Sequence, residues 1–164
     1  MDYFYILVEC SNSSDVKMIS ITVKQTINAT PLQIRKILLE HEQLHRFFNA
    51  EFLLMKIQDE GEVKGGKGAI RQISMMGVKF EEKIVSADNN HISYQIIGNK
   101  PVSEHRGNIN FSQDNNTATP NTEVNYNISC KAPWWIPSFI LSFFIKKDVK
   151  QALSKLAIKF NVKT

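Results

Sequence analysis

The feature that most constrains the fold is a run of six strand-like segments joined by short turns and followed by one long helix. The strand-like segments span residues 52–58, 69–74, 78–85, 91–97, 104–111 and 123–130. Alternating apolar and polar side chains are typical of half-buried strands. Connections this short favour antiparallel neighbours, so the sequence predicts an antiparallel meander.

The flanking segments complete the predicted fold. Residues 18–27 alternate in the same way and predict one more strand, and Thr30-Pro31 is a helix-start signal. A helical pattern then runs from 31 to 48, either unbroken or split near Glu40. The helix over 138–160 carries an apolar stripe made of Leu141, Ile145, Val149, Leu153, Leu156 and Phe160. The order predicts an α+β domain with the long helix on one face of a curved sheet.

Length and composition limit the class of protein. A chain of 164 residues fits one domain, which we place at residues 18–164, and a net charge of +4 is too small to indicate a nucleic-acid partner. Residues 1–17 form an extension in which Tyr3–Val8 has the composition of an added edge strand. The sequence has no secretory signal, and its apolar runs are too short to span a bilayer, so we expect a soluble, cytoplasmic protein. Its two cysteines are far apart in the sequence and are expected to be reduced, with a single disulfide between them as the alternative.

Four stretches, together with the terminal helix, resemble the START/birch-allergen-like (SRPBCC) superfamily, in its bacterial branch of polyketide cyclase/dehydrase and lipid-transport proteins. The stretches are ITVKQTINATPLQIRKIL at 21–38, GAIRQI at 68–73, FEEKIVSADNNHISY at 80–94 and TEVNY at 122–126. The resemblance implies a helix-grip fold: a seven-stranded antiparallel sheet around a C-terminal helix, two short helices after the first strand, and an apolar cavity. Members bind lipids, sterols or polyketides, and a minority catalyse cyclisation or condensation. No cofactor is expected.

Arg71 and Glu82 form the best-supported pair of polar residues. If Met76-Gly77 is a two-residue hairpin loop, Arg71 lies opposite Glu82, while Ile73 and Phe80 share their face, which is apolar and so points inward. A buried Arg–Glu pair could orient a ligand carboxylate or hydroxyl through the guanidinium. The alternative is a purely structural ion pair.

Tyr94, His105 and Tyr126 alternate in phase with apolar residues such as Ile96 and Ile109, so all three are predicted to point inward. Isolated polar groups on an apolar wall fit a ligand pocket, although core residues with satisfied hydrogen bonds would show the same pattern. The spacing assembles no set of nucleophile, base and orienting residue. In an enzyme, His105 and Tyr94 would be the acid/base candidates.

The segment from His41 to His45 matches H-E-x-x-H, in which two helical histidines bind zinc and the Glu is a general base. Both histidines fall near the apolar face of the predicted helix. Phe48 and Glu51 stand where the extended motif has Gly and His, and the predicted fold is not that of a zinc protease. We therefore interpret the match as chance and predict no metal.

The beginning of the long helix carries a second apolar face, preceded by two tryptophans and followed by lysines. These residues are Trp134, Trp135, Ile136, Phe139, Ile140, Phe143 and Phe144, then Lys146, Lys147 and Lys150. An aromatic surface next to lysines suits peripheral contact with an anionic membrane. Packing on the first helices to close the cavity mouth, or a dimer interface, would use the same residues.

The sequence therefore predicts a protein that binds or carries a hydrophobic small molecule or lipid between the sheet and the C-terminal helix. A cyclase/aromatase-type enzyme in the same cavity is the alternative, and a zinc hydrolase at His41, Glu42 and His45 is the remote one. The predicted partners include no nucleic acid, and the protein is expected to be a monomer or a homodimer. The predicted ligand-binding residues are Arg71, Ile73, Phe80, Glu82, Tyr94, Ile96, His105, Ile109, Tyr126, Trp134, Trp135 and Leu141.

Overall fold

The chain folds in the predicted order of elements, as seen in a computed structural model that describes residues 17–99, 101–113 and 119–161. The predicted strand Tyr3–Val8 lies outside these ranges. The elements are β1 (Met18–Ile27), α1 (Pro31–Leu39), the 3-10 helix η1 (His41–Arg46), β2 (Glu51–Lys56), β3 (Ile70–Met75), β4 (Val78–Ala87), β5 (His91–Ile97), β6 (Ser103–Gln113), β7 (Thr122–Lys131) and α2 (Ser138–Asn161).

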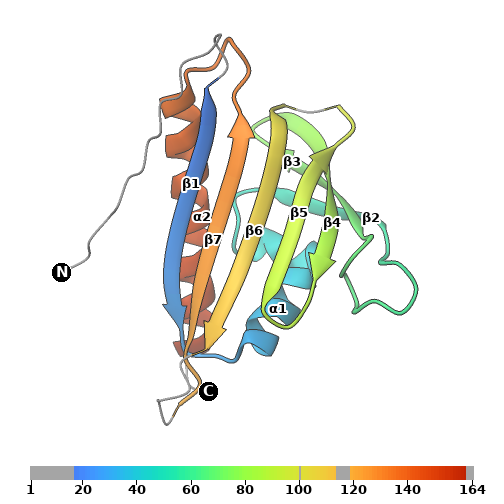
Figure 1. Cartoon of the computed structure of the whole chain (residues 1–164), viewed down its shortest axis with the longest axis vertical. Coiled ribbons are helices and arrows are strands. Elements are labelled where there is room, and N and C mark those ends of the chain that lie inside the picture. The colour runs from blue at the N-terminus through green and yellow to red at the C-terminus, as the bar shows by residue number, and fades with distance from the viewer. Residues whose placement is uncertain (1–16, 100, 114–118, 162–164) are drawn as a thin grey trace, which may run out of the picture.

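The strands form one seven-stranded antiparallel sheet in the order β1-β7-β6-β5-β4-β3-β2. Figure 1 shows the sheet curving around α2, which runs behind β1 and β7, with α1 behind the lower parts of β6 and β5. The 3-10 helix η1 packs against β2. The predicted α+β helix-grip architecture is therefore confirmed.

The β3–β4 hairpin has the predicted register. Met76 and Gly77 both have positive φ, 50° and 79°, which is the backbone of a type I′ two-residue turn. Met75 pairs with Val78 and, further along, Arg71 pairs with Glu82. A tight turn thus sets which side chains face one another across the two strands.

The helical segment after β1 is split at Glu40, which is one of the two alternatives that the sequence allowed. Thr30 caps α1 with a complete capping box, and Pro31 occupies the first turn. The helix ends at Leu39 because Glu40 leaves helical geometry (φ −81°, ψ 73°), and residues 41–46 continue as a 3-10 helix. The break turns His41 inward, where it is buried.

The predicted stripe on α2 is correct in the C-terminal half and incomplete in the N-terminal half. Val149, Leu153 and Leu156 are buried, together with Ala152 and Ala157. By contrast Leu141 and Ile145 are only half-buried, as is Phe160 at the other end. The N-terminal turns of α2 therefore stand farther out of the core than the stripe predicts.

Candidate functional site

A buried ion pair stands at the centre of the inner face of the sheet. Arg71 on β3 and Glu82 on β4 are 7% and 5% exposed. Arg71 Nε and Nη2 both donate to Glu82 Oε2, at 3.0 and 2.7 Å. Burial alone would lower the pKa of Arg71, but the facing carboxylate outweighs this effect and raises it, so the guanidinium stays charged.

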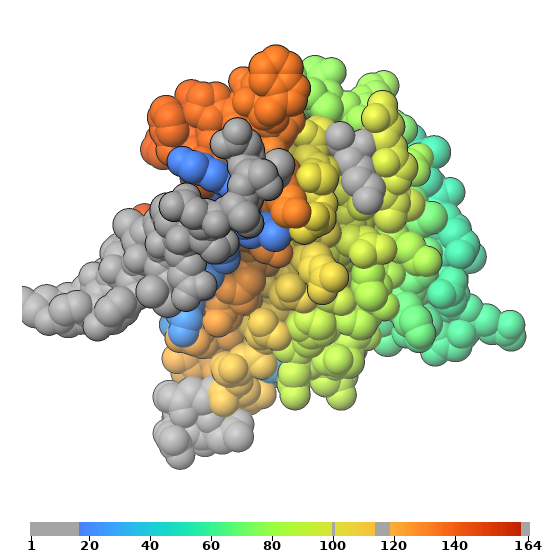
Figure 2. Space-filling view, turned by 45° about the horizontal axis from the view of Figure 1, so that its top comes forward, coloured from blue at the N-terminus to red at the C-terminus, as the bar shows by residue number. Residues whose placement is uncertain are grey.

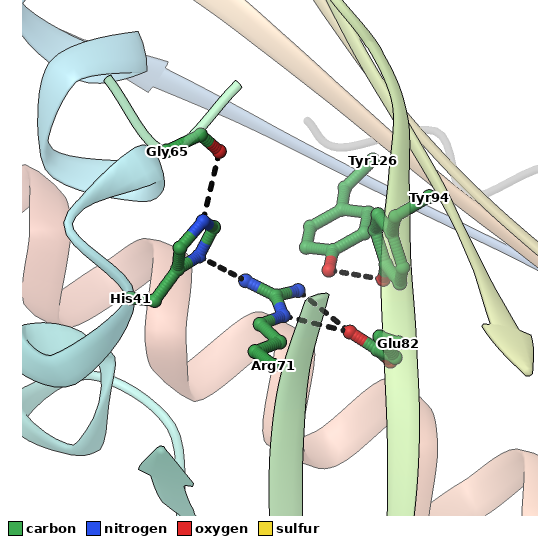
Figure 3. Close-up of polar contacts among 6 residues, drawn as sticks. All are labelled: His41, Gly65, Arg71, Glu82, Tyr94 and Tyr126. Carbon is green, nitrogen blue, oxygen red and sulfur yellow. Dashed lines mark hydrogen bonds and ion pairs between the residues drawn. The ribbon is translucent and has the colours of Figure 1, made fainter. Parts of the chain in front are cut away.

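His41 is the third member of this cluster. Its Nδ1 lies 3.3 Å from Arg71 Nη1, and its Nε2 lies 2.8 Å from the carbonyl of Gly65 (Figure 3). Arginine can only donate and a carbonyl can only accept, so the pattern defines a neutral imidazole with its proton on Nε2. Burial and the positive charge of Arg71 together lower the His41 pKa to about 4, despite the opposing hydrogen bond to Gly65.

Two tyrosines, from β5 and β7, lie next to the ion pair. The hydroxyls of Tyr94 (β5) and Tyr126 (β7) are hydrogen-bonded to each other across β6. This reach depends on Gly107 of β6, because a Cβ there would lie 2.1 Å from Cζ of Tyr94. The guanidinium of Arg71 lies 5.3 Å from the Tyr94 ring centre and 5.4 Å from that of Phe52, on β2. Burial raises the pKa of both tyrosines, which remain neutral donors or acceptors.

His105 carries an unsatisfied nitrogen beside this cluster. Its ring lies 5.6 Å from that of Tyr94, and its buried Nδ1 has no hydrogen-bond partner among the residues that the structure describes. Burial lowers its pKa, so the imidazole is neutral at pH 7. A buried polar atom without a partner, next to the polar cluster, marks a place for a ligand or water.

Arg71 also retains hydrogen-bonding capacity. Its bonds to Glu82 and His41 use three of its five N–H groups. One N–H on Nη1 and one on Nη2 are left over within the described part of the chain. The cluster can therefore accept a carboxylate or hydroxyl without first breaking the ion pair.

The space next to the cluster is small in this structure. A cavity of about 10 Å³ is enclosed by apolar side chains and three polar ones, and it has the volume of a single water-sized sphere. Its lining consists of Leu38, Leu44, Phe48, Arg71, Ile84, Ile92, Tyr94, Ile109 and Tyr126. The predicted ligand cavity between the sheet and the helices is therefore filled by side chains, and a ligand of lipid size can enter only if these elements move apart.

A much larger hollow opens where β5 and β6 part. Their ladder runs only from His91↔Asn110 to Tyr94↔Gly107, and β6 then bulges at Glu104, whose φ is 51°. The resulting β5–β6 hollow measures about 710 Å³ and is lined by Met18, Gln95, Ile96, Ile97, Gly98, Glu104, His105, Arg106 and Ser129. Most of these residues, such as Gln95 and Arg106, occupy outer-face positions, while Ile96 and His105 contribute from inner-face positions, so the hollow opens on the outer side of the sheet.

The predicted ligand-binding residues divide into three groups. Arg71, Glu82, Tyr94 and Tyr126 come together in the buried cluster, and His105 adjoins it. The apolar residues face inward as predicted: Ile73, Ile96 and Ile109 are buried, while Phe80 and Leu141 are half-buried.

The tryptophans form the third group and stand outside the interior. Trp134 is 93% and Trp135 66% exposed, and Phe139, Ile140, Phe143 and Phe144 are also exposed. These six residues, hereafter the aromatic tip, lie in the loop after β7 and the first turns of α2, the orange region that projects at the top of Figure 2. The interpretation that they pack on the first helices and close a cavity mouth is wrong. No helix in the described part of the chain is long and apolar enough to cross a membrane.

The H-E-x-x-H residues are not arranged as a zinc site requires. His41 and His45 lie in a 3-10 helix, where positions four apart do not share a face as they do in an α-helix, and His45 is exposed. Both ring nitrogens of His41 are already hydrogen-bonded. Within residues 17–99, 101–113 and 119–161, no three His, Cys, Asp or Glu side chains are grouped to hold a metal ion.

Sequence reasoning missed the hydrogen-bonding role of His41 and the spacer role of Gly107. The partner of His41 is a backbone carbonyl in a loop 24 residues away, which no local pattern reveals. Gly107 did leave a signal, because a glycine in the middle of a strand indicates close approach of another group.

A curved antiparallel sheet gripping a C-terminal helix defines the class of helix-grip domains. Residues 18–160 match the family described as polyketide cyclase / dehydrase and lipid transport, and the chain belongs to this family. No curated protein matches the sequence.

Several solved structures share the fold at low sequence identity. A START superfamily protein from Mycobacterium smegmatis superposes with a TM-score of 0.67 at 11% identity, covering 88% of this chain and 97% of that one. The protein XoxI from Bacillus cereus gives 0.65 at 15% identity, with 87% and 96% covered. Ara h 8.0201 gives 0.64 at 10% identity, with 89% and 99% covered.

Proposed function

We propose that the protein binds or carries a hydrophobic small molecule or lipid between the sheet and α2, with the ligand's polar end at Arg71. The family is associated with lipid transport, and the buried polar cluster is the observation that carries the proposal for this chain. An apolar interior gives affinity through burial, and a few convergent polar groups fix orientation. The unused N–H groups of Arg71 and Nδ1 of His105 are the orienting atoms.

The ligand must enlarge the interior, and the structure favours movement of one wall. No residue of α2 before Val149 is fully buried, whereas five residues from Val149 to Ala157 are. Outward movement of the N-terminal turns therefore exposes little additional core. Asp148, which accepts a hydrogen bond from the backbone N–H of Asn49 at 3.1 Å, ties the middle of α2 to the turn before β2 and marks where the movement would end.

The first test is native mass spectrometry of the freshly purified protein, followed by organic extraction. We expect an adduct of lipid mass that solvent releases. A protein that arrives bare is then titrated with a pyrene-labelled fatty acid. Failure to bind this probe as well would overturn the proposal.

The orienting role is tested with the paired substitution Arg71→Met/Glu82→Leu. Removing both charges avoids the cost of leaving one buried and unpaired. We expect affinity for a pyrene-labelled fatty acid to fall by about tenfold or more, and affinity for a pyrene-labelled hydrocarbon of equal length to change by less than about threefold. The matched control is Glu81→Leu/Lys83→Met, which removes the same charges from outward-facing positions of β4. Equal losses for both probes would refute the orienting role.

A cyclase/aromatase-type activity is the second candidate, favoured by His105. A neutral, half-buried imidazole whose buried Nδ1 has no partner among the described residues, next to the Tyr94 ring, is a suitable proton acceptor. This candidate requires turnover that His105→Ala or Tyr94→Phe abolishes while binding survives. A cytoplasmic location and a monomeric or homodimeric state remain predictions.

A further inference from the structure

The aromatic tip is an exposed surface that the interior does not use. Phe139 and Phe143 are 73% and 62% exposed, next to the two tryptophans. Contiguous aromatic surface of this kind on a soluble domain marks an interaction site. Its amphipathic indoles suit a boundary between water and hydrocarbon.

Basic residues flank the tip along the chain on both sides, although Lys131 is paired with Glu104 of β6. No acidic residue occurs between Glu123 and Asp148, whereas Lys146, Lys147 and Lys150 follow the aromatic turns. Phe139, Phe143 and Lys147 recur every fourth residue and so share one side of α2. At about 1.5 Å of rise per residue, Lys147 lies about 6 Å beyond Phe143 along the helix.

This spacing matches the edge of a bilayer. A headgroup layer is about 5–8 Å thick, so a tip with Phe143 at the acyl boundary holds Lys147 near the phosphates. A second copy of the chain fits less well, because a two-fold contact through the tip brings the same lysine-bearing turns together. Anionic lipid is the occupant whose charge complements this turn.

The tip also lies at the end of the molecule where the β5–β6 hollow opens. Lys131, three residues before Trp134, pairs with Met18 and with Ser103 at the rim of the hollow. The hollow extends inward to His105 and Ile96. A protein docked by its tip would thus hold this hollow, and His105 in its lining, close to the lipid.

We propose that the aromatic tip inserts into anionic bilayers, and that the membrane is the source and destination of the ligand. The second half of this statement rests on the proposed function, because only a lipid carrier needs such a source. The docking half stands on the exposed aromatics and the neighbouring lysines alone.

The chain supplies its own reporter for docking. Its two tryptophans both lie in the tip, so intrinsic fluorescence reports this surface. With phosphatidylcholine vesicles that contain one-third phosphatidylserine, we expect blue-shifted emission, quenching by lipids with brominated acyl chains, and co-sedimentation. Binding to pure phosphatidylcholine should be weaker by about tenfold or more and should show less salt dependence.

Two matched variants locate the surface. Phe139→Ser/Phe143→Ser should weaken co-sedimentation by about tenfold or more. Ile158→Ser, an equally exposed apolar position at the other end of α2, should leave it unchanged. Equal weakening by both, no binding to anionic vesicles, or a stable dimer that the double variant dissociates would overturn the docking.

A separate measurement distinguishes this failure from failure of the proposed function. Both variants should bind the pyrene-labelled fatty acid in vesicle-free buffer as the unmodified protein does. Docking without any fatty-acid binding would overturn the carrier function and the membrane's role as ligand source. Fatty-acid binding without docking would overturn only the membrane contact of the aromatic tip.

Discussion

The two ends of α2 are built differently. At the C-terminal end Leu153 and Leu156 are each 1% exposed, and they belong to the same hydrophobic core as Ile27 of β1 and Val124 of β7. The side chain of Asn28, just after β1, donates a hydrogen bond at 2.8 Å to that of Asn161, the last residue of α2. At the N-terminal end the same helix has no fully buried residue and projects aromatic side chains outward.

The difference indicates a division of work along one helix. The closed end anchors α2 to the sheet, so it contributes most of the stability. The open end carries the tip and the hollow, where groups that bind or move are found. The polar cluster around Arg71 belongs to the interior between them. If this division is right, stability and ligand exchange respond to different residues.

The largest expected effect is at the closed end. Leu153→Ala should lower the free energy of unfolding by about 3 kcal/mol, because it removes a fully buried side chain and leaves a cavity. Leu141→Ala, the same change in the half-buried part of α2, should cost about 1 kcal/mol. Urea unfolding of the two variants measures the contrast. Equal losses of stability would mean that α2 is anchored along its whole length, and the proposed difference between its two ends would be wrong.

The next effect concerns pH and the interior cluster. His41 has its pKa lowered from 6.5 to about 4, so below pH 6.5 the unfolded chain takes up a proton that the folded protein refuses. Stability is therefore full above pH 7 and falls as the pH drops from 6.5 toward 4, by about 2 kcal/mol between pH 7 and pH 5. The lowered pKa of His105 acts in the same direction.

Urea unfolding as a function of pH checks this sign. His41→Gln keeps one acceptor for Arg71 and one donor for Gly65 but does not titrate, so it should flatten the slope between pH 7 and pH 5. His45→Gln, at an exposed position, is the control and should leave the slope as it is. Because His105 contributes a slope of the same sign, a residual slope is expected, but a slope as steep as that of the unmodified protein would contradict the neutral imidazole of His41.

The sequence predicts the closed end better than the open end for a physical reason. Strand alternation, the Met76-Gly77 turn and the helix-start signal at Thr30-Pro31 are local, and they determine the sheet, its register and the α1 start. The pairing of Arg71 with Glu82 could be predicted from the sequence, because the length of a hairpin loop fixes which residues of its two strands lie opposite each other. The N-terminal stripe of α2 misled the prediction, because periodicity shows which side is apolar but not how close the sheet comes.

The unpredicted parts of the site depend on long-range geometry. His41 meets Gly65 and Arg71 only because Glu40 ends the helix and turns the chain. The β5–β6 hollow arises from an irregular residue, Glu104, whose positive φ no sequence pattern announces. The closed cavity of about 10 Å³ likewise follows from side-chain packing rather than from the fold class.

A hydrogen bond gives a smaller test of the closed end. Thr122 is fully buried, and its hydroxyl donates to the carbonyl of Ala29 at 2.6 Å, which ties the start of β7 to the turn after β1. Thr122→Val keeps the shape and removes the bond, so we expect unfolding free energy to fall by about 1–2 kcal/mol. Thr22→Val, on the exposed outer face, removes a hydroxyl bonded to Asn127 and should cost less than about 0.5 kcal/mol. The reverse ranking would show that the closed end is not the anchor.

The smallest expected effect is at the open end, where it is also the most informative. Phe143→Ser and Ile158→Ser replace apolar side chains that are 62% and 61% exposed, on opposite ends of α2. Neither should change the free energy of unfolding by more than about 0.5 kcal/mol, because exposed substitutions away from the core rarely do. If urea unfolding gives this result while vesicle binding falls only for Phe143→Ser, the aromatic side chain serves contact with lipid rather than folding. A loss of more than about 1 kcal/mol for Phe143→Ser alone would instead place the tip inside the folded core in solution, and the division between the two ends would have to be abandoned.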